Sequence, residues 1–300
     1  MKIKWINNGI WAIIGLLFWT CNSKVEIPAY IYVENVDFII TDPTLQGSSS
    51  SKITDVWVTV NGKNIGAYQL PALLPVIAEG NTELIFEAGI KLNGLSQQRP
   101  KYPLYTIHKE VINLRKGEID TVFPVFKYQE IVKFPIIEDF ENAGLKFFSI
   151  DSGVVLRKTN DNSLVFRNGN EPNNFSGIIE LPASDNIYFF EIKTTSPLMF
   201  NSSSAIDCFV ELNFCFTQNV DIGIYCHYPS ASSKQVPIIT IIGQENNTEW
   251  NKIYVNLTKE MVDATTSTFG MTHFDVYMKS GVPKGKTARY LFDNIKIVHR

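Results

Sequence analysis

Short runs of alternating apolar and polar residues fill the first part of the chain, between residues 29 and 128. A period of two predicts half-buried strands, because neighbouring side chains in a strand point to opposite faces. Asn61-Gly62 follows one such run, and this dipeptide favours a tight hairpin turn. About seven strands with turns every 8–12 residues predict an antiparallel sandwich. The runs are AYIYVENVDFII (29–40), ITDVWVTV (53–60), NTELIFEAGIKLNG (81–94), YTIHKEVINL (105–114) and IDTVFPVFKY (119–128).

The stretch LPALLPV, residues 70–76, breaks this alternation because it is apolar throughout and contains two prolines. Proline removes a ladder donor, so the stretch is not expected to form a central strand. We expect a loop folded over a sheet edge. The alternative is an exposed apolar patch that binds a partner protein.

The second part of the chain, from residue 133, carries a series of short motifs whose order is informative about its fold. It opens with an acidic-Phe-Glu turn in KFPIIEDFEN (133–142), and a Trp begins TEWNKIYVNLT (248–258). NIYFFEIKTT (186–195), HFDVYMKSG (273–281) and ARYLFDNIKIVHR (288–300) are the other members of the series. This series resembles the strands of a carbohydrate-binding-module (galactose-binding-like) jelly roll, and the first part is similar to Ig-like or transthyretin-like domains. The fold class that follows is all-β, with two antiparallel β-sandwich domains at 28–129 and 130–300.

The N-terminus reads as an export signal. Lys2 and Lys4 precede a ten-residue apolar run, Ile10–Trp19, which is too short to span a bilayer comfortably. The run stops at Thr20-Cys21, and this resembles a bacterial lipoprotein signal (residues 1–20) with a cysteine that carries acyl chains such as palmitate. A plain signal peptide and an uncleaved anchor are the alternatives.

The resemblance implies a lipid anchor at Cys21 and a short linker, residues 21–27. Asn22 follows the cysteine where an Asp often retains such proteins in the inner membrane, so we expect the outer membrane. Its periplasmic and cell-surface faces are both open. The net charge is −3 and basic residues form no block, so nucleic acid is not an expected partner.

Three cysteines remain in the mature chain, all within the second part. Two interpretations are open for them: a disulfide between Cys215 and Cys226 across a hairpin, or three buried free thiols with Cys208 as the third. No CxxC motif is present, so a zinc site is not predicted.

The jelly-roll resemblance also implies a structural calcium ion. Asp139 and Glu141 belong to the opening turn and Asp293 to the final strand, and in many such folds these positions meet at one edge. Calcium takes six to eight oxygen ligands, so carboxylates from distant strands suit it. The alternative is that Asp293 holds a turn by hydrogen bonds to the backbone.

Glycan binding needs exposed aromatic faces beside polar groups. The aromatic candidates are Tyr225, Tyr228, Trp250, Tyr254 and Tyr277. Tyr225, Tyr228 and the nearby His227 border the loop YPSASSKQVP (228–237) and are the best placed, although packing also explains them. Trp250 is expected in the core. The sequence has no GxSxG, HExxH or phosphate-loop motif, so no catalysis is predicted.

The function that we expect from these patterns is that of a non-catalytic outer-membrane lipoprotein. It would serve as an accessory or structural subunit of a cell-envelope protein complex. The alternative is a glycan-binding lipoprotein that uses its C-terminal jelly roll.

Overall fold

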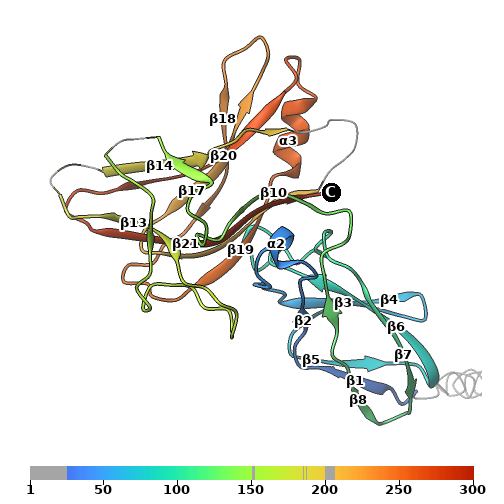
Figure 1. Cartoon of the computed structure of the whole chain (residues 1–300). Coiled ribbons are helices and arrows are strands. Elements are labelled where there is room, and N and C mark those ends of the chain that lie inside the picture. Colours follow the sequence, from blue (N-terminus) through green and yellow to red (C-terminus); the bar gives the residue numbers. More distant parts are fainter. Residues whose placement is uncertain (1–25, 151–152, 185, 187, 200–206) are drawn as a thin grey trace, which may run out of the picture.

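The computed structural model describes residues 26–150, 153–184, 186, 188–199 and 207–300 (Figure 1). The predicted lipidation residue Cys21 lies outside these residues. The prediction of an all-β chain is confirmed, since in these residues only two short helices accompany the strands. Within the described residues, no helix has the length and apolar character needed to cross a bilayer.

Residues 28–132, called the first half here, hold ten of these elements around one hydrophobic core. Their bounds are β1 Ala29–Val33, β2 Asp37–Phe38, α2 Pro43–Gln46, β3 Asp55–Val60, β4 Lys63–Gln69, β5 Ala72–Val76, β6 Gly80–Gly89, β7 His108–Leu114, β8 Ile119–Thr121 and β9 Val125–Phe126.

Two sheets enclose the core of the first half: a four-stranded sheet in the order β4-β3-β6-β7 and a three-stranded sheet in the order β5-β1-β8. The Asn61-Gly62 turn joins β3 to β4 with both residues at positive φ, 47° and 78°, as the sequence predicts. The pairing is not wholly antiparallel, because β8 runs parallel to β1 and β9 runs parallel to β2. The Ig-like topology therefore stays a prediction.

The loop expected at residues 70–76 is wrong, because Ala72–Val76 form strand β5. The strand pairs with β1 on one side and is the edge of its sheet, with Tyr30 opposite Pro75. An edge strand tolerates proline, since one side of its backbone has no ladder to complete. Leu74 and Val76 enter the core, whereas Leu73 is exposed.

Residues 133–300, the second half, form two six-stranded sheets that face each other across a larger core. One sheet has the path β12-β13-β21-β16-β19 with β10 also on β21, and the other has β11-β14-β20-β17-β18 with β15 also on β20. The bounds are β10 Lys133–Glu138, β11 Phe147–Ser149, β12 Arg157–Thr159, β13 Ser176–Leu181, β14 Tyr188–Thr194, β15 Leu198–Met199, β16 Cys208–Phe216, β17 Val220–His227, β18 Lys234–Ile241, β19 Asn251–Asn256, α3 Thr258–Thr265, β20 His273–Val282 and β21 Ala288–His299.

The two halves share a seam that is both apolar and charged. Phe209, Tyr254 and Val298 belong to strands of the second half, yet they pack into the core of the first. Between them lies the fully buried Glu211 of β16. Its carboxylate accepts hydrogen bonds from the hydroxyls of Tyr102 at 2.8 Å and Tyr128 at 2.9 Å; Lys252 lies 3.2 Å away.

The predicted Cys215–Cys226 disulfide is wrong: both residues, and Cys208, are buried free thiols. The expectation assumed that β16 and β17 pair as a hairpin, but the chain passes from one sheet to the other between them. Cys215 packs on the outside of its sheet with Ile178 and Leu291, whereas Cys226 points into the main core. Burial raises the pKa of the Cys208 thiol to about 12, so it stays protonated.

Candidate functional site

The outer face of the sheet β11-β14-β20-β17-β18 gathers polar and aromatic side chains. Its inward positions, such as Ile192, Ile224 and Val276, are fully buried in the core. Side chains alternate along each strand, so the intervening residues share the outer face. This group of residues, called the polar strip here, consists of Glu191 and Lys193 on β14, Tyr225 and His227 on β17, Gln235 on β18, and Asp275, Tyr277 and Lys279 on β20.

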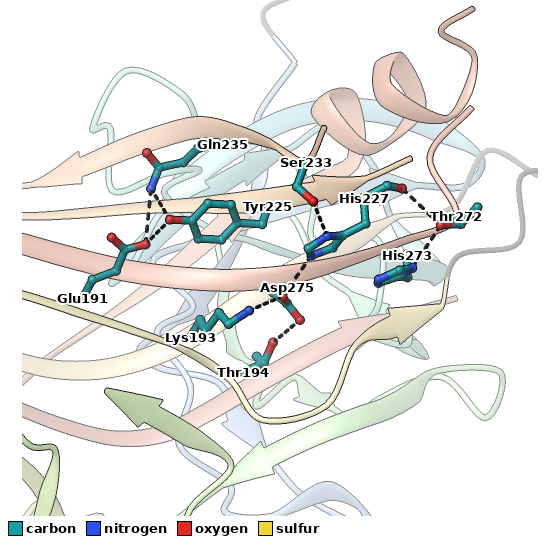
Figure 2. Close-up of polar contacts among 10 residues, drawn as sticks. All are labelled: Glu191, Lys193, Thr194, Tyr225, His227, Ser233, Gln235, Thr272, His273 and Asp275. Carbon is teal, nitrogen blue, oxygen red and sulfur yellow. Dashed lines mark hydrogen bonds and ion pairs between the residues drawn. The ribbon is translucent and has the colours of Figure 1, made fainter. Parts of the chain in front are cut away.

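One end of the polar strip is a ring of hydrogen bonds around Tyr225 (Figure 2). The Tyr225 hydroxyl donates to Glu191 and accepts from the Gln235 amide at 3.1 Å. Lys279 in turn donates to the Gln235 carbonyl oxygen at 2.9 Å. Burial and the bond to Glu191 raise the pKa of Tyr225 well above its ordinary value, so the phenol remains a donor. Four strands therefore hold four polar groups in fixed positions.

The other end of the strip is organised by Asp275, which is almost fully buried. Its carboxylate accepts from Lys193 at 3.0 Å and from Thr194 at 3.4 Å, and it lies 3.0 Å from His227 Nε2 (Figure 2). The opposite ring nitrogen of His227 is 2.7 Å from the Ser233 hydroxyl. The His227 ring thereby connects the loop before β18 to a carboxylate on β20.

The order of hydroxyl, imidazole and carboxylate invites comparison with a nucleophile and its base. Here the Asp275 carboxylate contacts both His227 and the ammonium of Lys193. The His227 ring also stacks on His273, with ring centroids 4.4 Å apart and planes 13° apart. These contacts hold the imidazole in place from three directions. The arrangement is suited to presenting fixed donors and acceptors to a polyhydroxylated ligand.

A hollow of about 710 Å³ adjoins the Glu191 end of the strip. Glu191, Asp221 and Lys279 form its polar wall, and Ile150 and Phe189 form its apolar wall. The Phe189 ring lies across Gly281 of the neighbouring strand, where a Cβ would stand only 2.8 Å from ring carbon Cε1. Because glycine lets the ring lie down on the sheet, Phe189 presents a face to solvent and is 60% exposed.

A second aromatic ring lies down on the same sheet. Tyr277 of β20 covers Gly223 of β17, and a side chain at that glycine would collide with the Tyr277 ring and with the Val236 carbonyl oxygen. Burial, with Asp221 and Glu191 nearby, raises the pKa of Tyr277 to about 12. The Lys279 ammonium lies 5.3 Å from the centre of the Tyr277 ring. Glycines opposite aromatic residues therefore flatten this face of the sheet.

Two of the three residues predicted from the sequence lie on this face. Tyr225 and His227 belong to the polar strip, but Tyr228 has the opposite parity and packs against the core. Its ring centroid is 6.4 Å from that of Phe269. Trp250 is half-buried outside the main core, 5.3 Å from the ring of Phe166.

The three acids predicted to hold calcium act as acceptors for protein donors. Glu141 accepts backbone N–H groups of Asn174 at 2.7 Å and Phe175 at 2.8 Å. Asp139 accepts the N–H of Glu141 at 3.1 Å, and Asp293 accepts the N–H of Asn294 at 2.7 Å. In the described part of the chain no three His, Cys, Asp or Glu side chains are grouped to hold a metal ion. The predicted calcium ion is untested, and these hydrogen bonds favour the alternative, in which the acids hold the backbone.

Sequence reasoning missed most of the polar strip. Glu191, Lys193, Asp275 and Lys279 occupy the outward positions of the alternating runs YFFEIKT and HFDVYMKS. Two runs that place charged and aromatic residues on the same outward face were the available signal. Alternation does not predict that β14 pairs with β20 and β20 with β17, and these pairings bring the residues together.

Structures of carbohydrate-binding modules are similar to this chain at a distance. The xylan-binding domain of module family 22 is 10% identical with a TM-score of 0.35, over 55% of this chain and 93% of that one. The family 11 module of the Clostridium thermocellum cellulase Lic26A-Cel5E is 12% identical with a TM-score of 0.36, over 56% of this chain and 95% of that one.

A two-module part of Clostridium thermocellum xylanase 10B is 9% identical with a TM-score of 0.36, over 55% of this chain but only 28% of that one. No protein-family model matches the sequence, and no curated protein matches it. At these scores the likeness is too distant to transfer a ligand to this chain.

Proposed function

We propose that this protein is a lipid-anchored protein of the outer membrane that binds a glycan without altering it. The binding surface would be the polar strip and the adjoining hollow. The observation that carries this proposal is the exposed ring of Phe189, laid across Gly281 beside Glu191, Asp221 and Lys279. Pyranose rings stack on such aromatic faces while their hydroxyls bond to neighbouring polar side chains.

The polar strip supplies groups of the kind that sugar hydroxyls need. Carboxylates, an amide, an ammonium and a phenol are held by one another rather than left mobile. A hydroxyl both donates and accepts, so acceptors such as Glu191 beside donors such as Lys279 suit it. Groups that are already ordered lose less conformational entropy when a ligand binds.

The proposal of a lipid anchor is based on the apolar run that stops before Cys21. A role as subunit of an envelope complex stays a prediction. In the stretch expected to carry that role, residues 70–76, Ala72, Leu74 and Val76 are buried, whereas Pro71, Leu73 and Pro75 are exposed.

The test is binding of the detergent-solubilised full chain to a broad array of glycans, followed by calorimetry with each glycan retained. Phe189→Ala should weaken binding at least about tenfold, which corresponds to about 1.4 kcal/mol. Phe269→Ala is the matched control, because Phe269 is 56% exposed and belongs neither to the polar strip nor to the lining of the hollow. Absence of any bound glycan, or equal loss in both variants, would contradict the proposal.

A further inference from the structure

The first half has two outer faces of opposite character. On the four-stranded sheet, ion pairs join Glu83 to Lys109 and Glu87 to Lys101 across that surface. On the three-stranded sheet β5-β1-β8, eight outward positions carry no charge, and the exposed Glu34 directly after β1 borders them. This apolar face consists of Tyr30 and Tyr32 on β1, Leu73, Pro75 and Ile77 on or directly after β5, and Ile119, Thr121 and Phe123 on or directly after β8.

The strand register makes the apolar face continuous. Tyr32 lies opposite Leu73 on one side and Thr121 on the other. Tyr30 lies in the same way between Pro75 and Ile119. Large apolar side chains gathered on one exposed surface usually mark contact with a protein or a membrane, whereas scattered ones need no explanation.

The position of β1 in the chain favours a membrane. Ala29, the first residue of β1, comes eight residues after Cys21, the predicted point of lipid attachment. A fully extended chain spans at most about 3.6 Å per residue, so β1 stays within roughly 29 Å of the acylated cysteine. β1 is also the central strand of the apolar face. Whatever the path of the linker, this sheet therefore stays close to the bilayer surface.

We propose that the apolar face lies on the lipid surface that holds the acyl chains of Cys21. This inference rests on the lipid anchor of the proposed function. Tyrosine suits the boundary between headgroups and acyl chains, where its ring is buried and its hydroxyl stays hydrated. Because the anchor keeps the effective concentration of lipid high, a shallow apolar contact is enough to fix the orientation of the first half.

The orientation has a consequence for the binding face. In Figure 1, β1, β5 and β8 lie at the bottom of the view, whereas β14, β17 and β20 lie at its upper left. With the apolar face on the membrane, the polar strip is held away from the lipid headgroups. The first half then acts as a rigid spacer that sets the direction of the second.

The experiment places tryptophan reporters in lipidated full-length protein reconstituted in vesicles of phosphatidylethanolamine and phosphatidylglycerol. The mature chain, residues 21–300, keeps two of the five tryptophans, Trp57 and Trp250; both are first replaced by Phe, and the residual signal is subtracted. Phe123→Trp then reports on the apolar face and Phe269→Trp on the second half, at sites of similar exposure, 59% and 56%. Bromines near the headgroup end of the acyl chains serve as quenchers.

We expect the bromines to quench the fluorescence of Phe123→Trp but not that of Phe269→Trp. Adding Leu73→Asp and Ile119→Asp should remove the quenching while the protein still floats with the vesicles. The exposed Ile242→Asp, outside the face, should leave quenching unchanged.

Two results overturn the inference, and they are distinguishable. Flotation without quenching at position 123 shows an anchor that holds the protein while the apolar face is elsewhere. If that result comes with a blue-shifted spectrum and sedimentation as a dimer, a second copy covers the face. Failure to float removes the anchor itself, and with it the reason to expect lipid at this face.

Discussion

Glu211 of β16 and Tyr102 of the first half are joined by a hydrogen bond of 2.8 Å at the centre of the seam between the two halves. The carboxylate is fully buried and is compensated by Tyr128 and Lys252 as well. Burial lowers the pKa of Lys252, and Glu211 opposes that shift. A charge in this position is tolerated only while its partners from both halves remain in place.

Glu211→Ala should therefore lower the free energy of unfolding by about 3–5 kcal/mol, because it leaves the Lys252 charge buried without compensation. Tyr102→Phe removes one hydrogen bond to the same carboxylate and should cost about 2 kcal/mol. Urea denaturation followed by circular dichroism measures both. Glu180→Ala, which breaks the exposed pair with Arg157, is the control and should change stability by about 0–1 kcal/mol. Equal effects at Glu211 and Glu180 would show that the seam does not depend on this charge.

The two glycines beneath aromatic rings should respond differently to the same substitution. At Gly281 a new Cβ meets mainly the exposed Phe189 side chain, which can rotate away. Gly281→Ala should therefore leave the protein folded and weaken binding of any glycan retained by the array. At Gly223 the Cβ meets the backbone carbonyl of Val236, so Gly223→Ala should destabilise the sheet itself. Thermal unfolding and calorimetry separate the two effects, and a Gly281→Ala protein with unchanged affinity would remove Phe189 from the site.

Lys296 predicts a pH dependence of stability. It is fully buried at the seam, where it donates to the Ser48 carbonyl oxygen at 2.7 Å, and burial lowers its pKa from 10.5 to about 7. Between these two values the unfolded chain holds a proton that the folded protein has released. The free energy of unfolding should therefore rise with pH over this window, by up to about 1.4 kcal/mol per pH unit.

Lys296→Met removes this titration. Relative to wild type, the variant should be most favoured below about pH 7, where the native lysine is charged and buried, and its advantage should shrink toward pH 10. Urea denaturation at pH 6, 8 and 9.5 gives the difference, with the exposed Lys63→Met as the control. A difference between wild type and Lys296→Met that stays constant across these pH values is incompatible with a charge transition at Lys296.

Calcium should not change the stability of this protein. The oxygens of Glu141 are occupied by N–H donors from residues 174 and 175, and those of Asp293 by Asn173, Ser176 and Asn294. We expect the same Tm in calcium chloride and in a chelator, and a loss of about 2 kcal/mol in Glu141→Ala under both conditions. A Tm that rises with calcium in wild type but not in Glu141→Ala would restore the calcium interpretation.

Alternation along the chain was enough to predict the strands of the first half except β5, because burial of one face imposes a period of two whatever the fold. The same pattern did not predict which strands pair or which residues from distant strands come into contact. From the sequence, Cys215 and Cys226 could face each other across a hairpin. They do not, because β16 and β17 belong to different sheets. Glu211 and Lys252 are the charged residues of β16 and β19, and Tyr102, which donates to Glu211, is 109 residues away from it in the sequence.

The error at β5 has a different cause. Two prolines argued against a strand, but the argument applies to the centre of a sheet and not to its edge. The sequence around Ala72–Val76 contains no sign of its position in the sheet, which is set by pairing with β1 more than forty residues earlier. The candidate site was likewise half predicted: Tyr225 and His227 came from one loop, whereas their partners on β14 and β20 required the sheet order.

Phe209, Tyr254 and Val298 complete a core that belongs to the other half. A chain cut near residue 130 would leave these three apolar side chains in water and Glu211 without its tyrosines. We therefore expect that the second half does not fold as an independent domain that gene fusion could transfer to an unrelated protein. Selection on either half acts on both, and the pair is inherited as one unit.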